Sequence, residues 1–301
     1  MSDSAVTFSA EELARGAGGR WTDGRGTAVS GVFTDTRQDG SGRLFIALSG
    51  ENFDAHDFLP AAVSAGAAAL CVAESKLGRL PEPCPVPVLA VADPLRSYQG
   101  IARLHRRRFP ELTVAAVTGS VGKTSVKEML RAIFTAAAGA ERVLYTVGNT
   151  NNQVGVPQNL LRLQPQRRFA VIEMGTNHHG EIEPLSCCAL PQVALVNSIA
   201  PCHLEFLGSL EGIAREKSRI FSGLPTDGTA VIPRSCPAVE VLAEAAAPFR
   251  LLRFGEGSGC AVEAHYCGGR LEGSSFELRF ADGERFEISW SLTGRHQAAN
   301  A

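Results

Sequence analysis

The sequence of 301 residues lacks several features that would assign it quickly to a class. None of its eight cysteines forms a C-x-x-C pair, and adjacent Cys187 and Cys188 fit neither a zinc knuckle nor a disulfide framework. No apolar run approaches the ~20 residues that span a bilayer, and the polar start MSDSAVTFS has no signal-peptide core. We therefore expect a cytoplasmic protein with reduced thiols and no membrane insertion.

An excess of charge of one sign is also missing. The formal net charge is -2 and the sequence pI is about 6.4, so no global basic field would attract nucleic acid. The run Arg106-Arg107-Arg108 is short, is followed by Pro110, and is typical of a solvated helix end. The sequence does contain 45% hydrophobic residues, which suffice for a sizeable core in two domains.

The N-terminal third alternates short strands and helices. Ser9 and Glu12 have capping-box spacing and predict the start of a short helix. Strands are expected near 31–34, 44–48, 68–72 and 86–91, and helices near 58–67 and from Pro94 to about Arg107. We interpret residues 1–108 as a small N-terminal α/β domain that ends at a hinge before Pro110.

From Thr113 onward, strands and helices alternate in a pattern typical of a doubly wound, mostly parallel sheet. We assign residues 109–301 to this second α/β domain, which becomes strand-rich and glycine-punctuated after Gly255. The strands are expected at 113–117, 143–146, 169–174, 193–199 and 229–233, and one of the helices at 209–221. Ligands bind such sheets beyond the carboxyl ends of their strands.

A phosphate-binding loop, TGSVGKTS, occupies residues 118–125 between the first of these strands and a helical run. This order directs backbone N–H groups and a helix N-terminus to one point. Lys123 would contact the outer phosphates of a nucleotide, and the Thr124 hydroxyl would reach Mg²⁺. The loop is of the shorter type, because Val117 stands where the longer form has glycine. An ordinary glycine-rich turn is the alternative. The nucleotide-binding candidates are Gly119, Ser120, Val121, Gly122, Lys123, Thr124 and Ser125.

Polar residues follow the neighbouring strands. Glu173 lies in the apolar run 169–174, and a carboxylate buried there needs a cation, a hydrogen-bond partner or a proton. Beside a phosphate loop the natural cation is Mg²⁺. Alternatively, the Glu173 carboxylate would cap a neighbouring helix or pair with an arginine. His203 also follows a strand, although a lone histidine is more often structural. His178 and His179 are neighbours whose side chains point opposite ways, which favours a loop role.

Two further candidates have plain alternatives. Lys217 lies in a helical run and would, from spacing alone, be a surface lysine paired with Glu211 or Glu216. Asn149, Asn151 and Asn152 offer amide donors and acceptors to a polar ligand, but asparagine-rich turns also occur without function.

Taken together, these segments resemble the Mur ligase family over nearly the whole chain. The resemblance rests on DTR (35–37), LFIALSGENFDAHDF (44–58), TGSVGKTSVKEML (118–130), GNTNNQVGVP (148–157), VIEMGTNHHGEI (171–182), NSIAPCHLEFLGSLEGIAREK (197–217) and GRHQAAN (294–300). It implies a monomeric enzyme that uses ATP and Mg²⁺ to join D-alanyl-D-alanine to UDP-N-acetylmuramoyl-tripeptide through an acyl phosphate, for peptidoglycan synthesis.

The resemblance also implies roles for individual residues. Thr124 and Glu173 would hold Mg²⁺, His203 would bind a second metal ion, and Lys217 would be carbamylated and face the metal. Lys123 would neutralise the phosphates. Residues 1–108 would be the N-terminal substrate domain, which holds the UDP end of the substrate and in which Asp35, Thr36 and Arg37 would contact the uridine. Asn151 and Asn152 would contact the muramoyl substrate, and Asn300 the adenine.

Some positions depart from the family pattern. Gln297 stands where asparagine is usual, and Ser218-Arg219 replace a usual Gly-Glu. The chain also stops at Ala301, where the family's C-terminal Rossmann-like domain should begin, so that this domain is expected to be absent. Two alternatives follow from the sequence. One is a truncated, non-catalytic nucleotide- or UDP-sugar-binding protein, and the other is a related Mur-type ligase with a different acceptor.

Overall fold

The computed structural model describes residues 6–257, 259–270 and 273–291. Its contacts divide the chain into two units, the first formed by Met1–Pro110 and Gln153–Pro165, the second by Glu111–Asn152 and Gln166–Ala301. Residues 153–165, which the sequence placed with the second domain, thus pack with the first. Val154 and Leu161, which flank helix α5 (Gly155–Leu160), pack against an apolar cluster of the first unit, and this contact explains why the segment joins the first core.

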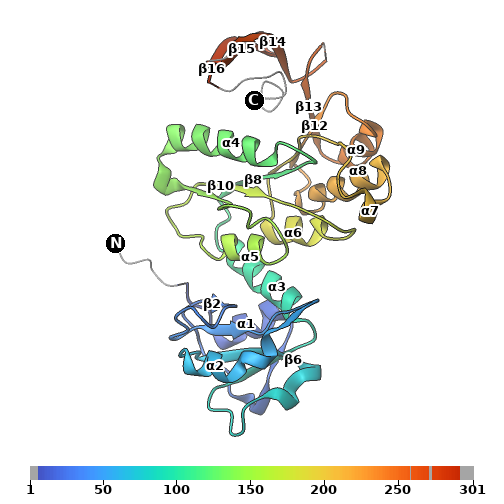
Figure 1. The fold of residues 1–301 in the computed structure, drawn as a ribbon. Helices are drawn as coiled ribbons and strands as arrows, with labels where there is room; N and C mark the ends of the chain where they lie inside the picture. Colours follow the sequence, from blue (N-terminus) through green and yellow to red (C-terminus); the bar gives the residue numbers. More distant parts are fainter. Residues whose placement is uncertain (1–5, 258, 271–272, 292–301) are drawn as a thin grey trace. The chain divides into compact units, whose positions relative to one another are not determined.

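The first unit is built on a five-stranded sheet in the order β1-β7-β6-β3-β2, of which β2 and β6 are labelled in Figure 1. Only β1 runs antiparallel to its neighbour; the other pairs are parallel. Two apolar clusters fill this unit, one of which includes residues of α1 and α3. The strands are β1 (Arg20–Trp21), β2 (Val32–Phe33), β3 (Leu44–Ile46), β6 (Ala69–Ala73) and β7 (Val88–Val91); the helices are α1 (Ala10–Ala17), α2 (Leu59–Ser64) and α3 (Pro94–Arg106); β4 (Ser49–Gly50) and β5 (Phe53–Asp54) form a separate hairpin.

The second unit contains a nine-stranded sheet in the order β16-β15-β14-β13-β12-β11-β8-β10-β9. Within this order, all neighbouring strands from β14 to β9, including β8, pair in parallel. Strand β15 pairs antiparallel with both β14 and β16. The strands are β8 (Thr113–Thr118), β9 (Val143–Tyr145), β10 (Phe169–Glu173), β11 (Val193–Val196), β12 (Thr229–Pro233), β13 (Arg250–Gly255), β14 (Val262–Arg270), β15 (Gly273–Phe280) and β16 (Arg285–Trp290); the helices are α4 (Lys123–Ala138), α6 (Ile182–Ala189), α7 (Leu204–Leu207), α8 (Leu210–Ser218) and α9 (Val239–Ala246). The predicted α/β class with a mostly parallel sheet is confirmed.

Strand order decides which residues of the second unit can meet. Because β8 lies between β10 and β11, the carboxyl ends of these three strands share one edge of the sheet. Glu173, the last residue of β10, is paired in register with Val117 of β8. The loop after β8 therefore begins beside the Glu173 side chain.

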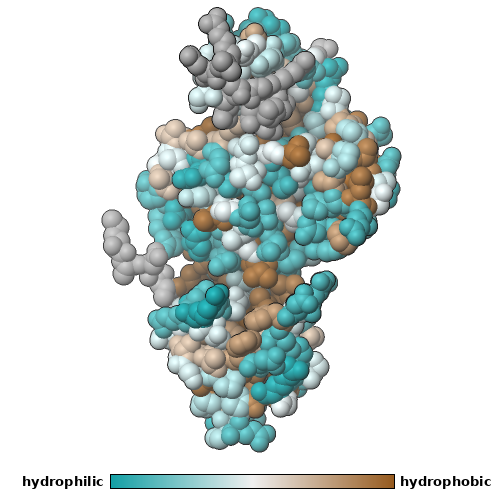
Figure 2. All heavy atoms as spheres, in the orientation of Figure 1, coloured by the Kyte–Doolittle hydropathy of each residue, from teal (hydrophilic) through white to brown (hydrophobic). Residues whose placement is uncertain are grey.

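The surface of the second unit is mixed in polarity (Figure 2). Hydrophobic residues gather over the region of α7 to α9 in this view, and Leu204 and Phe206 of α7 are 43% and 49% exposed. In the part of the chain that the structure describes, no helix combines the length and apolar character needed to cross a membrane.

The predicted capping box opens α1. The Ser9 Oγ accepts a hydrogen bond from the Glu12 N–H (3.2 Å), and a Glu12 carboxylate oxygen accepts one from the Ser9 N–H (2.9 Å). We expect Ser9→Ala to reduce the free energy of unfolding by about 1 kcal/mol, because one helix N–H loses its acceptor. Urea denaturation would measure this loss. Ser9→Thr, which keeps the hydroxyl, should retain most of the stability; equal losses in both variants would contradict the capping role.

Candidate active site

The loop between β8 and α4 has the geometry of a phosphate-binding loop. Gly122 precedes α4 in the left-handed conformation (φ +80°), which favours glycine. Gly119 has a different reason to be glycine, because a Cβ there would overlap the Asn197 side chain. The helix makes its first hydrogen bond from the Val126 N–H to the Gly122 carbonyl (3.0 Å). The N–H groups of Lys123, Thr124 and Ser125, in the first turn of the helix, thus have no partner inside the helix and can bind an anion.

The segment after β11 holds this loop in place. The Ser120 N–H donates to the Ser198 carbonyl (2.9 Å), and the Ser198 hydroxyl donates to the Val121 carbonyl (2.8 Å). The Asn197 amide also donates to the Val121 carbonyl (2.8 Å). Sequence reasoning did not name Asn197 or Ser198 as candidates. Their position directly after a buried strand was the signal that could have found them.

Lys123 is turned toward the loop rather than away from it. Its Nζ donates a hydrogen bond to the Gly119 carbonyl (2.8 Å). The ammonium therefore lies beside the first N–H groups of α4, where it adds positive charge to that of the helix N-terminus.

Glu173 and Thr124 lie together at the edge of the sheet. The Glu173 side chain is 1% exposed, and its two carboxylate oxygens are 3.3 and 3.1 Å from the Thr124 hydroxyl, which donates to them. The Asn151 amide donates to the same carboxylate (2.8 Å), and the Glu173 N–H donates to the Thr146 hydroxyl (2.9 Å). Each of these groups is neutral. A buried carboxylate beside a hydroxyl is a donor set that Mg²⁺ accepts, with water completing its shell.

Lys217 is buried, not on the surface. Only 1% of Lys217 is exposed, which excludes the surface ion pair that its spacing suggested. Burial, and after it repulsion from the Lys123 ammonium, lowers the pKa of Lys217 to about 8, whereas Cys202 and Glu216 act in the opposite direction. Lys217 therefore lies within electrostatic reach of the phosphate loop and holds part of its amine neutral near pH 8.

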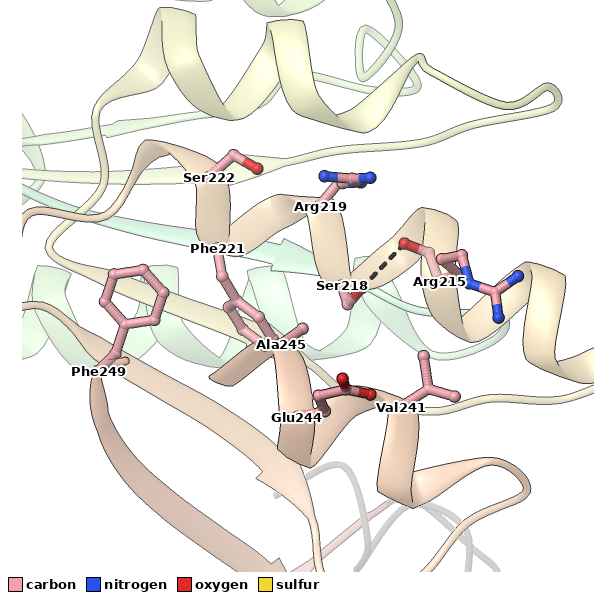
Figure 3. Close-up of a pocket in the computed structure, with 9 residues that line it drawn as sticks. All are labelled: Arg215, Ser218, Arg219, Phe221, Ser222, Val241, Glu244, Ala245 and Phe249. Carbon is pink, nitrogen blue, oxygen red and sulfur yellow. Dashed lines mark hydrogen bonds between the residues drawn. The ribbon is translucent and has the colours of Figure 1, made fainter. Parts of the chain in front are cut away.

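Glu216 is directed to a different partner from Lys217. Its carboxylate accepts hydrogen bonds from the N–H groups of Gly180 (2.7 Å), Glu181 (3.0 Å) and Ile182 (2.9 Å). It thereby caps the start of α6. Another side of α8, together with the turn that follows it, lines an open cavity of about 400 Å³ against α9 (Figure 3). Arg215 and Ser218 of α8 and Arg219 of the turn are among its lining residues. Lys217 is not among the residues that line this cavity.

The histidine-containing loop before α6 is organised by Glu181. Burial raises the pKa of Glu181, but hydrogen bonds from the Asn177 and His178 N–H groups and the Thr176 hydroxyl outweigh it, so the pKa is lowered overall. The His178 ring contacts Phe206 edge-on, with ring centroids 4.4 Å apart. His178 and His179 are both exposed residues of this loop.

Not every candidate residue from the sequence is placed beside the phosphate loop and Glu173 by the contacts of the described residues. His203 is exposed and precedes α7 with φ +52°. Within the described ranges, no three His, Cys, Asp or Glu side chains form a group that could hold a metal ion. Asn152 is exposed, and Asn300 lies outside the described residues, as does Gln297.

In the first unit, Asp35 and Arg37 form a tight pair in the loop after β2. The Arg37 guanidinium donates to both carboxylate oxygens, with a shortest distance of 2.6 Å. This contact lowers the pKa of Asp35 to about 2. Thr36 between them is half-buried, and the Arg37 side chain is exposed.

A second network in the first unit was not anticipated. The buried His56 ring accepts from the Ala73 N–H through Nε2 (3.1 Å), so its Nδ1–H donates to Asp54 (2.6 Å). Lys76 (2.7 Å) and Arg79 (3.0 Å) donate to the same carboxylate. The hydrogen bond from Lys76, followed by those from His56 and Ser49, holds the pKa of Asp54 well below its usual range. These contacts fasten the β4–β5 hairpin to the segment after β6.

Comparisons with known proteins show which family the chain resembles. The model of the Mur ligase middle domain matches residues 117–301. UDP-N-acetylmuramoyl-tripeptide--D-alanyl-D-alanine ligase of Haemophilus influenzae is 40% identical over 274 residues, which cover 91% of this chain and 58% of the relative. The Escherichia coli protein of the same name is 46% identical over 209 residues, or 69% of this chain and 44% of the relative.

Solved structures show the same likeness. MurF from Acinetobacter baumannii superimposes with a TM-score of 0.89 at 32% identity, covering 99% of this chain and 63% of that one. The MurF ligase of Thermotoga maritima in complex with ADP gives a TM-score of 0.73 at 26% identity, covering 89% and 60%. The chain thus spans about three-fifths of the length of these structures.

The requirement for glycine at position 119 can be tested by binding. We expect Gly119→Ala to weaken ADP binding at least about tenfold, because the added methyl would displace Asn197 and with it the loop. Isothermal titration calorimetry would measure the change. Gly78→Ala is the matched control, since a Cβ there meets nothing within 4 Å. Unchanged ADP binding by Gly119→Ala would contradict the packing argument.

The lowered pKa of Lys217 predicts a pH dependence of stability. Between pH 8 and pH 10.5 the folded protein has released the Lys217 proton while the unfolded chain still binds it, so stability should rise with pH in this window. The rise is at most about 1.4 kcal/mol per pH unit. Denaturation of the parent and of Lys217→Met in CO₂-free buffer would measure it. Parallel pH profiles for the two proteins would show that Lys217 keeps an ordinary pKa.

Proposed function

This chain belongs to the Mur ligase family, and we propose that it carries the ATP- and UDP-substrate-binding parts of a cytoplasmic, monomeric ligase that joins D-alanyl-D-alanine to UDP-N-acetylmuramoyl-tripeptide. The observation that carries the proposal is the contact of Thr124 with buried Glu173 at the phosphate loop. The names of the relatives support the choice of substrates.

The proposed reaction has two steps. The γ-phosphoryl group of ATP passes to the terminal carboxylate of the tripeptide, which gives ADP and an acyl phosphate. The amine of D-alanyl-D-alanine then attacks the acyl carbon, loses a proton and expels phosphate, so that a peptide bond replaces the acyl–phosphate bond. Phosphoryl transfer of this kind depends on positioning and charge neutralisation more than on covalent chemistry by the protein.

The second unit would supply the groups for the first step. The N–H groups at the start of α4 would bind the phosphates, and Lys123 would neutralise their outer oxygens. Thr124 and Glu173 would hold Mg²⁺ through the oxygen atoms that lie together in the structure. When bound, Mg²⁺ would offset the charge on the phosphate oxygens.

Lys217 would enter the site as a carbamate. Its neutral amine would attack CO₂, form a C–N bond and release a proton, and the cation would become an anion able to face Mg²⁺. The burial and lowered pKa of Lys217 favour this reaction because the neutral amine is the nucleophile. His203 is proposed as a ligand of a second metal ion.

The remaining proposed roles are contacts with the UDP-linked substrate and with the adenine of ATP. Asp35, Thr36 and Arg37 of the first unit would contact the uridine end of the substrate. Asn151 and Asn152 would face the muramoyl part. Asn300 would lie near the adenine.

Phosphate release tests the function. The protein that contains this chain, at the length of its relatives, should release phosphate from ATP only when UDP-N-acetylmuramoyl-tripeptide and D-alanyl-D-alanine are both present. Lys123→Ala should lower the rate by about 100-fold or more while leaving the circular dichroism spectrum unchanged. The exposed Arg96→Gln is a control that should keep full activity.

Other results would select another function. Phosphate release that ignores D-alanyl-D-alanine but requires a different amine would indicate a ligase with another acceptor. Binding of ADP and UDP-substrate without any turnover would indicate a non-catalytic binding protein. Either result would refute the proposed reaction.

A further inference from the structure

A cavity of about 430 Å³ lies between α1 and α3 of the first unit and is lined by arginines. Arg15 comes from α1, Arg103 from α3, and Arg107 and Arg108 from the residues that follow α3. Glu12 is the one acid among the lining residues. The arginine run at 106–108, interpreted from the sequence as a solvated helix end, therefore contributes two side chains to a concave site.

The cavity is formed by the packing of two helices rather than by loops. The two helices approach closely where Gly16 meets Gly100, because a Cβ at Gly100 would overlap the Gly16 carbonyl oxygen. Leu104 also lines the cavity and contacts this crossing point. The arginines consequently project from backbone whose spacing is set by close packing.

The single acid of the cavity already has partners. The Glu12 carboxylate accepts from the Ser9 N–H (2.9 Å) and from Arg108 (2.7 Å). Arg108 is itself held in place, since it also donates to the Thr7 carbonyl (2.8 Å) and lies over the Phe8 ring at 4.7 Å. Glu12 and Arg108 thus form a completed pair. Arg15 interacts with the Glu12 charge only through space, without an ion pair at contact distance, and Glu12 is the sole acid that lines the cavity with four arginines.

The other three arginines lack an anion in the part of the chain that the structure describes. Every acid among these residues lies beyond ion-pair distance of Arg15, Arg103 and Arg107. The Nε of Arg103 is also buried and has no hydrogen-bond partner among the described residues. A buried donor without an acceptor is unusual in a folded protein, and here it accompanies a cavity with excess positive charge.

The ends of the helices explain only part of this arrangement. Cations are favourable in the last turn of a helix, where Arg15 and Arg103 stand. That effect does not supply an acceptor for the Arg103 Nε, and it does not explain why arginines from both helices surround one cavity. Repulsion among them would be relieved by a bound anion.

We propose that this cavity binds a phosphorylated small molecule that carries at least two negative charges. Arg103 and Arg107 are four residues apart, which puts them on one side of the chain as it leaves α3. Guanidinium groups bind phosphate oxygens in a planar, bidentate geometry, so several of them favour a ligand with more than one anionic group. The volume suits a ligand of this size. The site shares no residue with the phosphate loop or with the Asp35–Arg37 pair, and it does not depend on the proposed function.

Inorganic pyrophosphate is the probe for this site. The titrations use the full chain with Lys123→Ala, which weakens binding at the phosphate loop. In this background we expect one pyrophosphate to bind, with an affinity that falls as salt is added. Arg103→Gln with Arg107→Gln should weaken binding at least tenfold. Arg96→Gln is the matched control on the same helix, with the same change of charge outside the cavity, and should change the Kd less than twofold.

Three results would overturn the proposal. The first is that pyrophosphate does not bind in the Lys123→Ala background. The second is that Arg96→Gln weakens pyrophosphate binding as much as the double variant does. The third is that the protein binds phosphatidylglycerol vesicles but not pyrophosphate, which would assign the arginines to a membrane surface. Thermal unfolding would confirm that the variants fold. If the double variant does not fold, Arg107→Gln replaces it, because this side chain is exposed, and it should weaken binding at least threefold.

Discussion

The second unit depends on one constraint, a carboxylate buried at the end of a strand without a cation beside it in the described structure. Glu173 can be buried there because Thr124, Asn151 and the edge of the sheet surround its oxygens with neutral donors. The register of β10 with β8 decides that these donors belong to the phosphate loop and its helix. A slip of one residue would turn the carboxylate to the other face of the sheet and separate it from Thr124.

Three consecutive residues of helix α8 face three different parts of the second unit. Glu216 caps α6 and thereby fixes the loop of residues 175–181, Lys217 is buried within electrostatic reach of Lys123, and Arg215 lies on the side that faces α9. Successive residues of a helix are about 100° apart, so neighbouring side chains can serve separate structures. In α1, a single side chain likewise serves two contacts. The Glu12 carboxylate accepts the capping hydrogen bond from the Ser9 N–H and also accepts one from Arg108.

Sequence patterns predicted the strands and the loop well because buried parallel strands are short apolar runs and the loop has a fixed spacing. They failed for Lys217, where spacing to Glu211 and Glu216 suggested a surface pair. The same helical periodicity held a better signal, since Ile213, Ala214 and Lys217 lie on one side and are all buried. The assignment of residues 153–165 could not be predicted, because an apolar helix between two strands does not reveal which core it joins. The Arg103 cavity was equally hidden, since it needs the crossing of two helices far apart in sequence.

Net charge is a poor guide to anion binding in this chain. A formal charge of -2 excludes a global basic field, yet the start of α4 with Lys123 and the arginines between α1 and α3 are both strongly positive places. Charges act over short distances in salt, with a Debye length of about 8 Å at physiological ionic strength, and they act more strongly where the surroundings exclude water. Acids elsewhere on the surface therefore cancel the total charge without cancelling the local field. Whether an anion binds depends on whether a nearby acid already neutralises the cations. Glu12 is the acid beside the arginines, and it is already engaged by Arg108 and the Ser9 N–H. Glu173 is the acid beside the phosphate loop, and its hydrogen bonds come from the neutral side chains of Thr124 and Asn151.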